Sequence, residues 1–91
     1  MNELERITEV LDGMDLPDWV VSLSAELTYD TDGERAVAIC AIVEDRVIDR
    51  SPPDRPRSMF RVDVIDALRT AGIELYPFVR FVAESEAHLL P

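Results

Sequence analysis

An uninterrupted apolar run near the middle of the chain constrains the fold more than any other feature. The run covers residues 36–43 and lies between the turn signal Asp32-Gly33 and the charged pair Glu44-Asp45. Its short length, its content of Val and Ile, and its polar boundaries are typical of a strand that is buried on both faces. We therefore predict that this run forms the central strand of a sheet.

The length of 91 residues predicts a single small domain, residues 1–91. A chain of this size buries only about 60 to 65% of its unfolded surface, so burial against a partner subunit would add to its stability. The apolar fraction of 47% is ordinary for a globular protein and argues against disorder, despite a formal net charge of -10. We expect a folded, acidic protein.

The charge composition limits the kinds of partner. The chain has 19 Asp and Glu residues against 9 Arg residues, and it has no Lys. The resulting negative field repels phosphate backbones and anionic membranes, so we expect no nucleic acid and no membrane among its partners. High-salt adaptation and codon bias in a GC-rich genome would both give this composition, and the sequence leaves the two explanations open.

The single cysteine and the N-terminus bear on the cellular compartment. Cys40 lies inside the apolar run, which excludes an intramolecular disulfide and predicts a small core residue. No apolar stretch reaches the roughly 18 residues of a membrane span. The first residues, MNELERI, carry acids instead of the basic region of a targeting segment. We expect a cytoplasmic protein.

The N-terminal third predicts a helix followed by a strand. Asn2 and Glu5 have the spacing of a helix N-cap and its N3 acid, and apolar residues follow at helical spacing as far as Gly13. Residues 19–29 alternate instead between apolar and mostly polar side chains, as in a strand with one buried and one wet face. The wet face is predicted to hold Val20, Ser22, Ser24, Glu26 and Thr28.

The link Asp30-Thr31-Asp32-Gly33 predicts a tight hairpin, because Asp-Gly readily adopts positive φ angles. We therefore expect residues 19–29 to pair antiparallel with the apolar run. The two acids of the link also resemble half of a calcium-binding loop, but the remaining ligand positions are absent, so no metal site is predicted.

The C-terminal half predicts a loop, a helix and an edge strand. Residues 45–57 form a proline- and arginine-rich segment whose three prolines favour an irregular surface loop. An amphipathic helix follows over residues 60–71 and ends at Gly72. Residues 75–84 predict a third strand, and Pro77 places it at a sheet edge because proline cannot donate a ladder hydrogen bond.

These elements predict an α+β fold, a two-layer α-β-β-α-β sandwich with a short tail over residues 85–91. A crossover helix makes the second and third strands parallel and places both helices on one face of a three-stranded mixed sheet, with the second strand central. The order resembles a ferredoxin-like plait that lacks its first strand, an architecture also found in the cytoplasmic domains of cation-efflux transporters. Those domains bind metal through His and carboxylates, whereas the single His of this chain, His88, lies in the predicted tail. The resemblance therefore implies a fold and no metal site.

The sequence contains no catalytic motif. A Ser/His/Asp arrangement would have to recruit His88 from a terminal segment, where mobility is common. Tyr76, Phe78 and Arg80 alternate on the third strand like a stacking platform for single-stranded RNA, but the acidic net charge argues against that function. We predict no catalytic residue and no cofactor, and hence a non-enzymatic role.

A cluster of arginines suggests an alternative function. Arg57 and Arg61 fall near the first turn of the predicted second helix, where free N–H groups and guanidinium groups together suit a phosphate or a carboxylate. Solvated ion pairs with Asp49, Asp54 and Asp63 are the simpler explanation of the cluster, because exposed ion pairs are common. The anion-binding candidates are Arg46, Arg50, Arg55, Arg57 and Arg61.

The central run also predicts self-association, because two helices cover only one face of the sheet while the run is apolar on both. The uncovered face would be an apolar stripe flanked by small polar groups, which is typical of an interface. A homodimer packed sheet on sheet would bury it, and pairing through the free edge of the first strand is the alternative. The interface candidates are Val20, Ser22, Ser24, Ile42 and Val43. The leading prediction is a small non-enzymatic module that binds its own copy or a partner protein, and the alternative is a domain that binds a small phosphate-bearing ligand.

Overall fold

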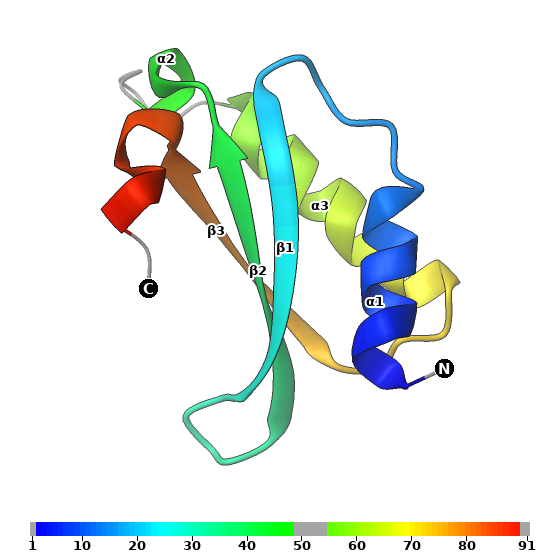
Figure 1. The fold of residues 1–91 in the computed structure, drawn as a ribbon. Helices are drawn as coiled ribbons and strands as arrows, with labels where there is room; N and C mark the ends of the chain where they lie inside the picture. The colour runs from blue at the N-terminus through cyan, green and yellow to red at the C-terminus, as the bar shows by residue number, and fades with distance from the viewer. Residues whose placement is uncertain (1, 49–54, 90–91) are drawn as a thin grey trace.

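A computed structural model describes residues 2–48 and 55–89 of the chain, and Figure 1 shows its elements. The elements are α1 (Glu3–Asp12), β1 (Val20–Tyr29), β2 (Arg35–Val43), α2 (Asp45–Ile48), α3 (Arg55–Thr70), β3 (Tyr76–Ala83) and the 3-10 helix η1 (Glu84–Leu89). The predicted α+β class with a three-stranded mixed sheet is confirmed. None of the described helices is long and apolar enough to cross a membrane.

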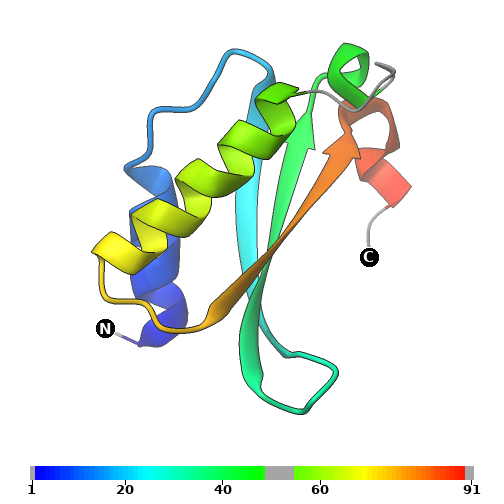
Figure 2. The ribbon, with the colours of Figure 1, turned by 180° about the vertical axis from the view of Figure 1, so that it is seen from behind.

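The sheet has the strand order β1-β2-β3, with β1 antiparallel and β3 parallel to the central strand β2. The long helices α1 and α3 lie on one side of the sheet, and η1 lies on the other side, at the carboxyl ends of β2 and β3 (Figures 1 and 2). The prediction that the apolar run is the middle strand, with two helices on one face, is therefore correct.

The hydrophobic core fills the space between this face of the sheet and the two long helices. On β2 the alternate side chains point toward the helices and are almost fully buried, and they are Val37, Ile39, Ala41 and Val43. The helices contribute Ile7 and Leu11 from α1 and Phe60, Val64 and Leu68 from α3. Removal of these apolar surfaces from water is the main source of the stability of a domain this small.

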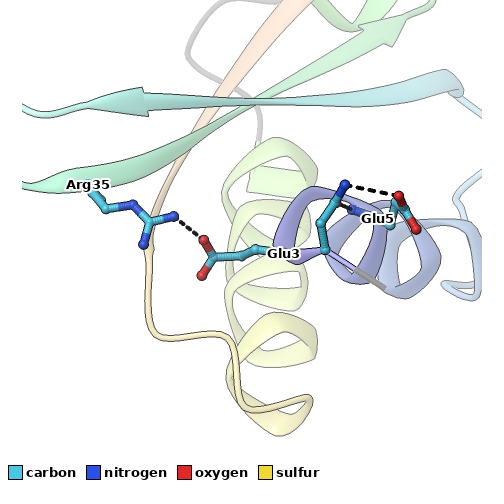
Figure 3. Close-up of polar contacts among 4 residues, drawn as sticks. Glu3, Glu5 and Arg35 are labelled. Carbon is cyan, nitrogen blue, oxygen red and sulfur yellow. Dashed lines mark hydrogen bonds and ion pairs between the residues drawn. The ribbon is translucent and has the colours of Figure 1, made fainter.

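The start of α1 is fixed by the predicted cap (Figure 3). The backbone N–H of Glu5 donates to Asn2 Oδ1 at 2.8 Å, and Asn2 Nδ2 donates in return to Glu5 Oε1 at 2.9 Å. These bonds satisfy a backbone donor that a free helix end would leave without a partner. An ion pair between Glu3 and Arg35 then links the first turn of α1 to the start of β2.

The hairpin between β1 and β2 is wider than the predicted tight turn. The last paired residues are Tyr29 and Arg35, which leaves residues 30–34 as the connection. Asp30 Oδ1 accepts hydrogen bonds of 2.9 Å from the backbone N–H groups of Asp32 and Glu34. Gly33, with a φ of 82°, supplies the positive φ. The Asp30 side chain therefore adds to the backbone bonds of the turn, in which the N–H of Asp30 donates to the carbonyl of Glu34 at 2.8 Å and the N–H of Gly33 donates to the carbonyl of Asp30 at 3.1 Å.

A β-bulge changes the alternation of β1 at its start. Val20 pairs with Val43 and Ser22 pairs with Ile42, so the register shifts between Val20 and Ser22. The extra residue turns Val20 toward the core, where it is 7% exposed, although the alternation predicts it on the wet face. From Leu23 onward the alternation of faces follows the prediction, but the burial does not: Leu23 and Ala25 pack against the core cluster, whereas Leu27 and Tyr29 are 41% and 70% exposed.

Two segments predicted to be irregular contain helices. Within the predicted loop, residues 45–48 form α2 and α3 begins at Arg55; Pro52 and Pro53 lie outside the described residues. Pro56 is the second residue of α3, a position that needs no N–H donor, so it is compatible with the helix. The predicted tail begins instead with a helix, because η1 covers its residues 85–89 and also takes in Glu84, the last residue of the predicted third strand.

The end of α3 and the start of β3 follow the prediction. Gly72 has a φ of 81°, and its N–H donates to the carbonyl of Arg69 at 3.0 Å. The N–H of Ile73 donates to the carbonyl of Leu68 at 3.0 Å, which closes the helix. β3 then forms one edge of the sheet, as expected for a strand that contains Pro77.

Candidate functional site

The face of the sheet that points away from α1 and α3 is the candidate functional site, and we call it the open face. The register places side chains of all three strands on it in rows: Ser24, Cys40 and Arg80 form one row, and Glu26, Ala38 and Phe78 form the next. The remaining members are Ser22, Ile42 and Val82 toward η1, and Thr28, Ala36 and Tyr76 toward the hairpin. Apart from the short η1 at one end, no described helix covers this surface (Figure 2).

The open face is uneven in height. Its side chains on β1 and β2 are mostly small, whereas β3 carries Tyr76, Phe78 and Arg80. The rings of Tyr76 and Phe78 lie 4.8 Å apart between centroids, and these residues are 58% and 45% exposed. A hollow of about 410 Å³ lies beside them, lined in part by Ser24, Glu26 and Ala38. Exposed aromatic rings beside a small-residue floor are typical of a protein contact surface.

Cys40 lies in the floor of this hollow, partly buried, on the open face. The prediction that it is a small core residue is therefore wrong, because Cys40 is not part of the core cluster. The core-facing residues of β2 are the neighbours in the alternation, Ile39 and Ala41. Because successive side chains of a strand point to opposite faces, Cys40 must face away from the helices.

The interface candidates from the sequence are divided between the two sides of the sheet. Ser22 and Ser24 are exposed and Ile42 is partly buried on the open face. Val20 and Val43 lie in the core instead, at 7% and 0% exposure. The bulge in β1 accounts for Val20, and the pleat of β2 puts Val43 opposite to Ile42.

The β3 side chains of the open face were not among the interface candidates. In the sequence, Tyr76, Phe78 and Arg80 form an alternating set that resembles an RNA-stacking platform. Parallel pairing of β3 with β2 brings this set beside Ala38 and Cys40. The alternation along β3 thus indicates that these three side chains share a face. The residues of β2 beside them follow only from the strand pairing, which the sequence does not define.

A hydrogen bond between distant segments holds η1 at one end of the open face. Asp45 Oδ1, at the start of α2, accepts from the backbone N–H of Ser85 at 3.0 Å. The backbone N–H of Ser85, and then its hydroxyl, lower the pKa of Asp45 below the ordinary value of 3.8. The contact fixes where the open face ends, because η1 lies over the carboxyl ends of β2 and β3 (Figure 2).

Replacing Asp45 by Asn is expected to make stability less dependent on pH in the acid range. A folded-state pKa that is lowered stabilises the protein above the unfolded pKa, and this contribution is lost as the pH falls through the folded value. The difference in stability between parent and Asp45→Asn should therefore be constant near neutral pH and shrink below a pH of about 4. Urea denaturation at a series of pH values measures it, with the exposed Asp66→Asn as control. A difference that stays constant down to the lowest pH would contradict the role of the carboxylate.

The anion-binding candidates are only partly described by the structure. Arg46 lies in α2 and bonds Glu44 at 3.0 Å. Arg50 and the side chain of Arg55 lie outside the described residues. Arg57 and Arg61 are one helical turn apart at the start of α3 and so share a side of that helix.

Arg57 and Arg61 differ in what they contact. Arg57 Nε is buried and has no hydrogen-bond partner among the described residues. The guanidinium of Arg61 lies 5.2 Å from the centroid of the Phe81 ring and donates to the carbonyl of Val79 at 3.5 Å. Arg61 therefore lies against β3, and Arg57 is the member whose buried Nε has no acceptor in the described part of the chain.

The other hollows and polar groups of the described residues provide weaker candidates for a binding site. A shallow hollow of about 770 Å³ lies between α1 and α3, and Val10, Met14 and Ala67 contribute to its lining. Arg6, at the same hollow, already donates to the carbonyl of Ala71 at 3.0 Å. Among residues 2–48 and 55–89 no three His, Cys, Asp or Glu side chains are grouped so that they could hold a metal ion. His88 is exposed on η1.

No protein family, curated protein or solved structure matches the chain. The resemblance to a ferredoxin-like plait thus remains a prediction from the order of the elements, and function has to be argued from the surfaces themselves.

Proposed function

We propose that the chain is a small, non-enzymatic protein-interaction module that self-associates through the open face of its sheet. The observation that carries this proposal is the exposed pair Tyr76 and Phe78 on the sheet face opposite to α1 and α3. Aromatic side chains supply large contact areas at low cost in conformational entropy, and they are enriched at the centres of interfaces. A second copy of the chain presents the same aromatic surface and is the simplest occupant.

The size of the domain also favours a second copy. The core is a single layer between one sheet face and two helices, and a chain of 91 residues has little further surface to bury within itself. Packing two sheets face to face at a spacing of about 10 Å would add a second apolar layer. Self-association would therefore add to stability as well as cover the aromatic pair.

Phe78→Glu is expected to convert a dimeric parent protein into a monomer. The substitution places a charge at the centre of the proposed interface, where its desolvation has no compensating partner. Light scattering at micromolar concentration measures the mass of the parent and the variant. Val62→Glu is the matched control, because Val62 is 54% exposed on α3 and lies away from the open face.

Two results would contradict this interface. A strictly monomeric parent would exclude self-association at these concentrations. A dimer that survives Phe78→Glu would move the interface to the free edge of β1, which Ser22 and Ser24 do little to protect.

A second candidate function is the binding of a small phosphate-bearing ligand at the start of α3. The observation in its favour is the buried Arg57 Nε, which has no partner in the described part of the chain. Helix starts and guanidinium groups both favour anions, although a phosphate would have to overcome the negative net charge.

Inorganic phosphate is then expected to raise the melting temperature of the parent, and Arg57→Ala combined with Arg61→Ala should abolish that rise. Without phosphate the double variant should keep its fold and most of its stability, because it removes cations from the positive end of a helix dipole. Arg69→Ala, at the other end of α3, is the control. No thermal shift in the parent would dispose of the anion site.

A further inference from the structure

The charges of the open face point to one geometry for the proposed dimer, an inference that rests on the self-association proposed above. We infer that the two open faces pack about a two-fold axis parallel to the strands, so that Arg80 of each copy pairs with Glu26 of the other copy. In this crossed geometry unlike outer strands face each other: β3 of each copy lies over β1 of the other copy, and the two β2 strands lie over one another.

The distribution of charge on the open face supports this pairing. Glu26 and Arg80 are its charged members, and they lie on the opposite outer strands β1 and β3. Both are exposed, both line the hollow over Ala38 and Cys40, and within residues 2–48 and 55–89 neither has an ion-pair partner. On a chain with a net charge of -10, the strands of this face carry one charge of each sign, and the acids Glu84 and Glu86 of η1 lie only at its end. The strand surface is therefore one where two acidic copies can meet with little like-charge repulsion.

The heights of the side chains select the direction of the axis. β3 carries the large side chains Tyr76, Phe78 and Arg80, whereas β1 carries Ser22 and Ser24. An axis parallel to the strands places the large row over the small row twice, which allows close packing. An axis across the strands would place β3 over β3 and β1 over β1. Large side chains would then pack against large ones, and like charges would lie on facing strands, Arg80 with Arg80 and Glu26 with Glu26.

The register brings the opposite charges within reach. Arg80 is level with Ser24 through their common neighbour Cys40, and Glu26 is two residues further along β1. Two residues of a strand span about 7 Å, which is comparable with the length of an arginine side chain. Arg80 of one copy, lying over Ser24 of the second copy, can therefore extend along β1 to Glu26. The symmetry repeats the contact, so that each dimer has two such pairs.

Charge reversal tests the crossed pairing directly. Glu26→Arg alone or Arg80→Glu alone would set like charges against each other twice in each dimer, and either is expected to weaken dimerisation by about 100-fold. An equimolar mixture of the two variants should recover a heterodimer of near-parental affinity, because both contacts are then between opposite charges. The double variant in a single chain should recover a homodimer for the same reason.

The controls separate this geometry from the net charge and from the proposed function. Glu74→Arg and Arg69→Glu change the net charge by the same amounts at exposed positions and should leave the dimer intact. Sedimentation at an ionic strength of roughly 0.1 M keeps the pair energies measurable, and circular dichroism confirms that each variant is folded.

The outcomes are distinct. Single reversals that dimerise as well as the controls, or a mixture that fails to recover, would overturn the crossed pairing while leaving self-association in place. A parent that is itself monomeric would overturn both the pairing and the proposed function.

Discussion

Truncation of Ile39 to alanine is expected to destabilise the fold by about 2 to 5 kcal/mol, because it leaves a cavity at the centre of the core. Ile39 is 1% exposed and lies on the middle strand, facing α1 and α3. Its neighbours are held by the sheet ladder on both sides, so they have little freedom to close the gap. For a domain of this size the loss is a large part of the total stability.

Urea denaturation of Ile39→Ala against Ser24→Ala measures this effect. Ser24 is exposed on the open face, so its truncation should change the free energy of unfolding by less than about 0.5 kcal/mol. Leu23→Ala should fall between the two, because Leu23 packs against the core cluster but is only partly buried. A larger effect at Ser24 than at Ile39 would mean that the faces of the sheet are assigned the wrong way round.

Val43→Glu is expected to abolish cooperative folding. Val43 is fully buried on the helix-facing side of β2, and a carboxylate there would lose its hydration with no cation nearby in the core cluster. The cost of several kcal/mol approaches the whole stability of a small domain. Ile42→Glu, one residue away but on the open face, should keep the fold and affect self-association instead.

Far-ultraviolet circular dichroism and thermal melts distinguish these two neighbouring variants. Loss of the melting transition in Val43→Glu together with its retention in Ile42→Glu is the expected pattern. A well-folded Val43→Glu protein would place Val43 at a surface and would restore it as an interface candidate.

The sheet and the long helices could be predicted because their signals are local. The apolar run at residues 36–43 has the length and composition of a buried strand, and the Asn2–Glu5 cap and the Gly72 stop are each made within a few residues. Local hydrogen bonds and side-chain period decide such elements with little help from the rest of the chain.

The errors arose where distant contacts decide the structure. The bulge that turns Val20 inward has no mark in the alternation of β1, because an extra residue in a strand leaves the same apolar pattern. η1 is ordered by the hydrogen bond between Ser85 and Asp45, which are 40 residues apart in the sequence. The local sequence around residues 85–91 therefore predicts an irregular tail, whereas in the fold the Asp45 carboxylate accepts a hydrogen bond from Ser85 and η1 forms.

The open face could be predicted only in outline. That one face of an apolar strand would lack helices follows from counting the helices against the faces, and this expectation named Ser22, Ser24 and Ile42 on that face. Which large side chains lie beside them depends on the parallel register of β3, which places Phe78 beside Ala38. Register is set by tertiary packing and has no local signal in the sequence.

The contacts of Arg61 and the missing N–H of Pro77 at the outer edge of β3 also limit how copies of this molecule can add to one another through their sheets. Arg61 lies across β3 onto Phe81 and the carbonyl of Val79, and Pro77 has no N–H to offer a further strand. Fibrils of the cross-β type grow because each added strand exposes a fresh, equivalent edge on both sides of the stack. A sheet that can pair along β1 but is obstructed along β3 has one usable edge. Two molecules that pair through their β1 edges therefore leave no free edge for a third. Partial unfolding that leaves β3 and α3 in place would thus lead to finite pairs of molecules and not to extended fibrils.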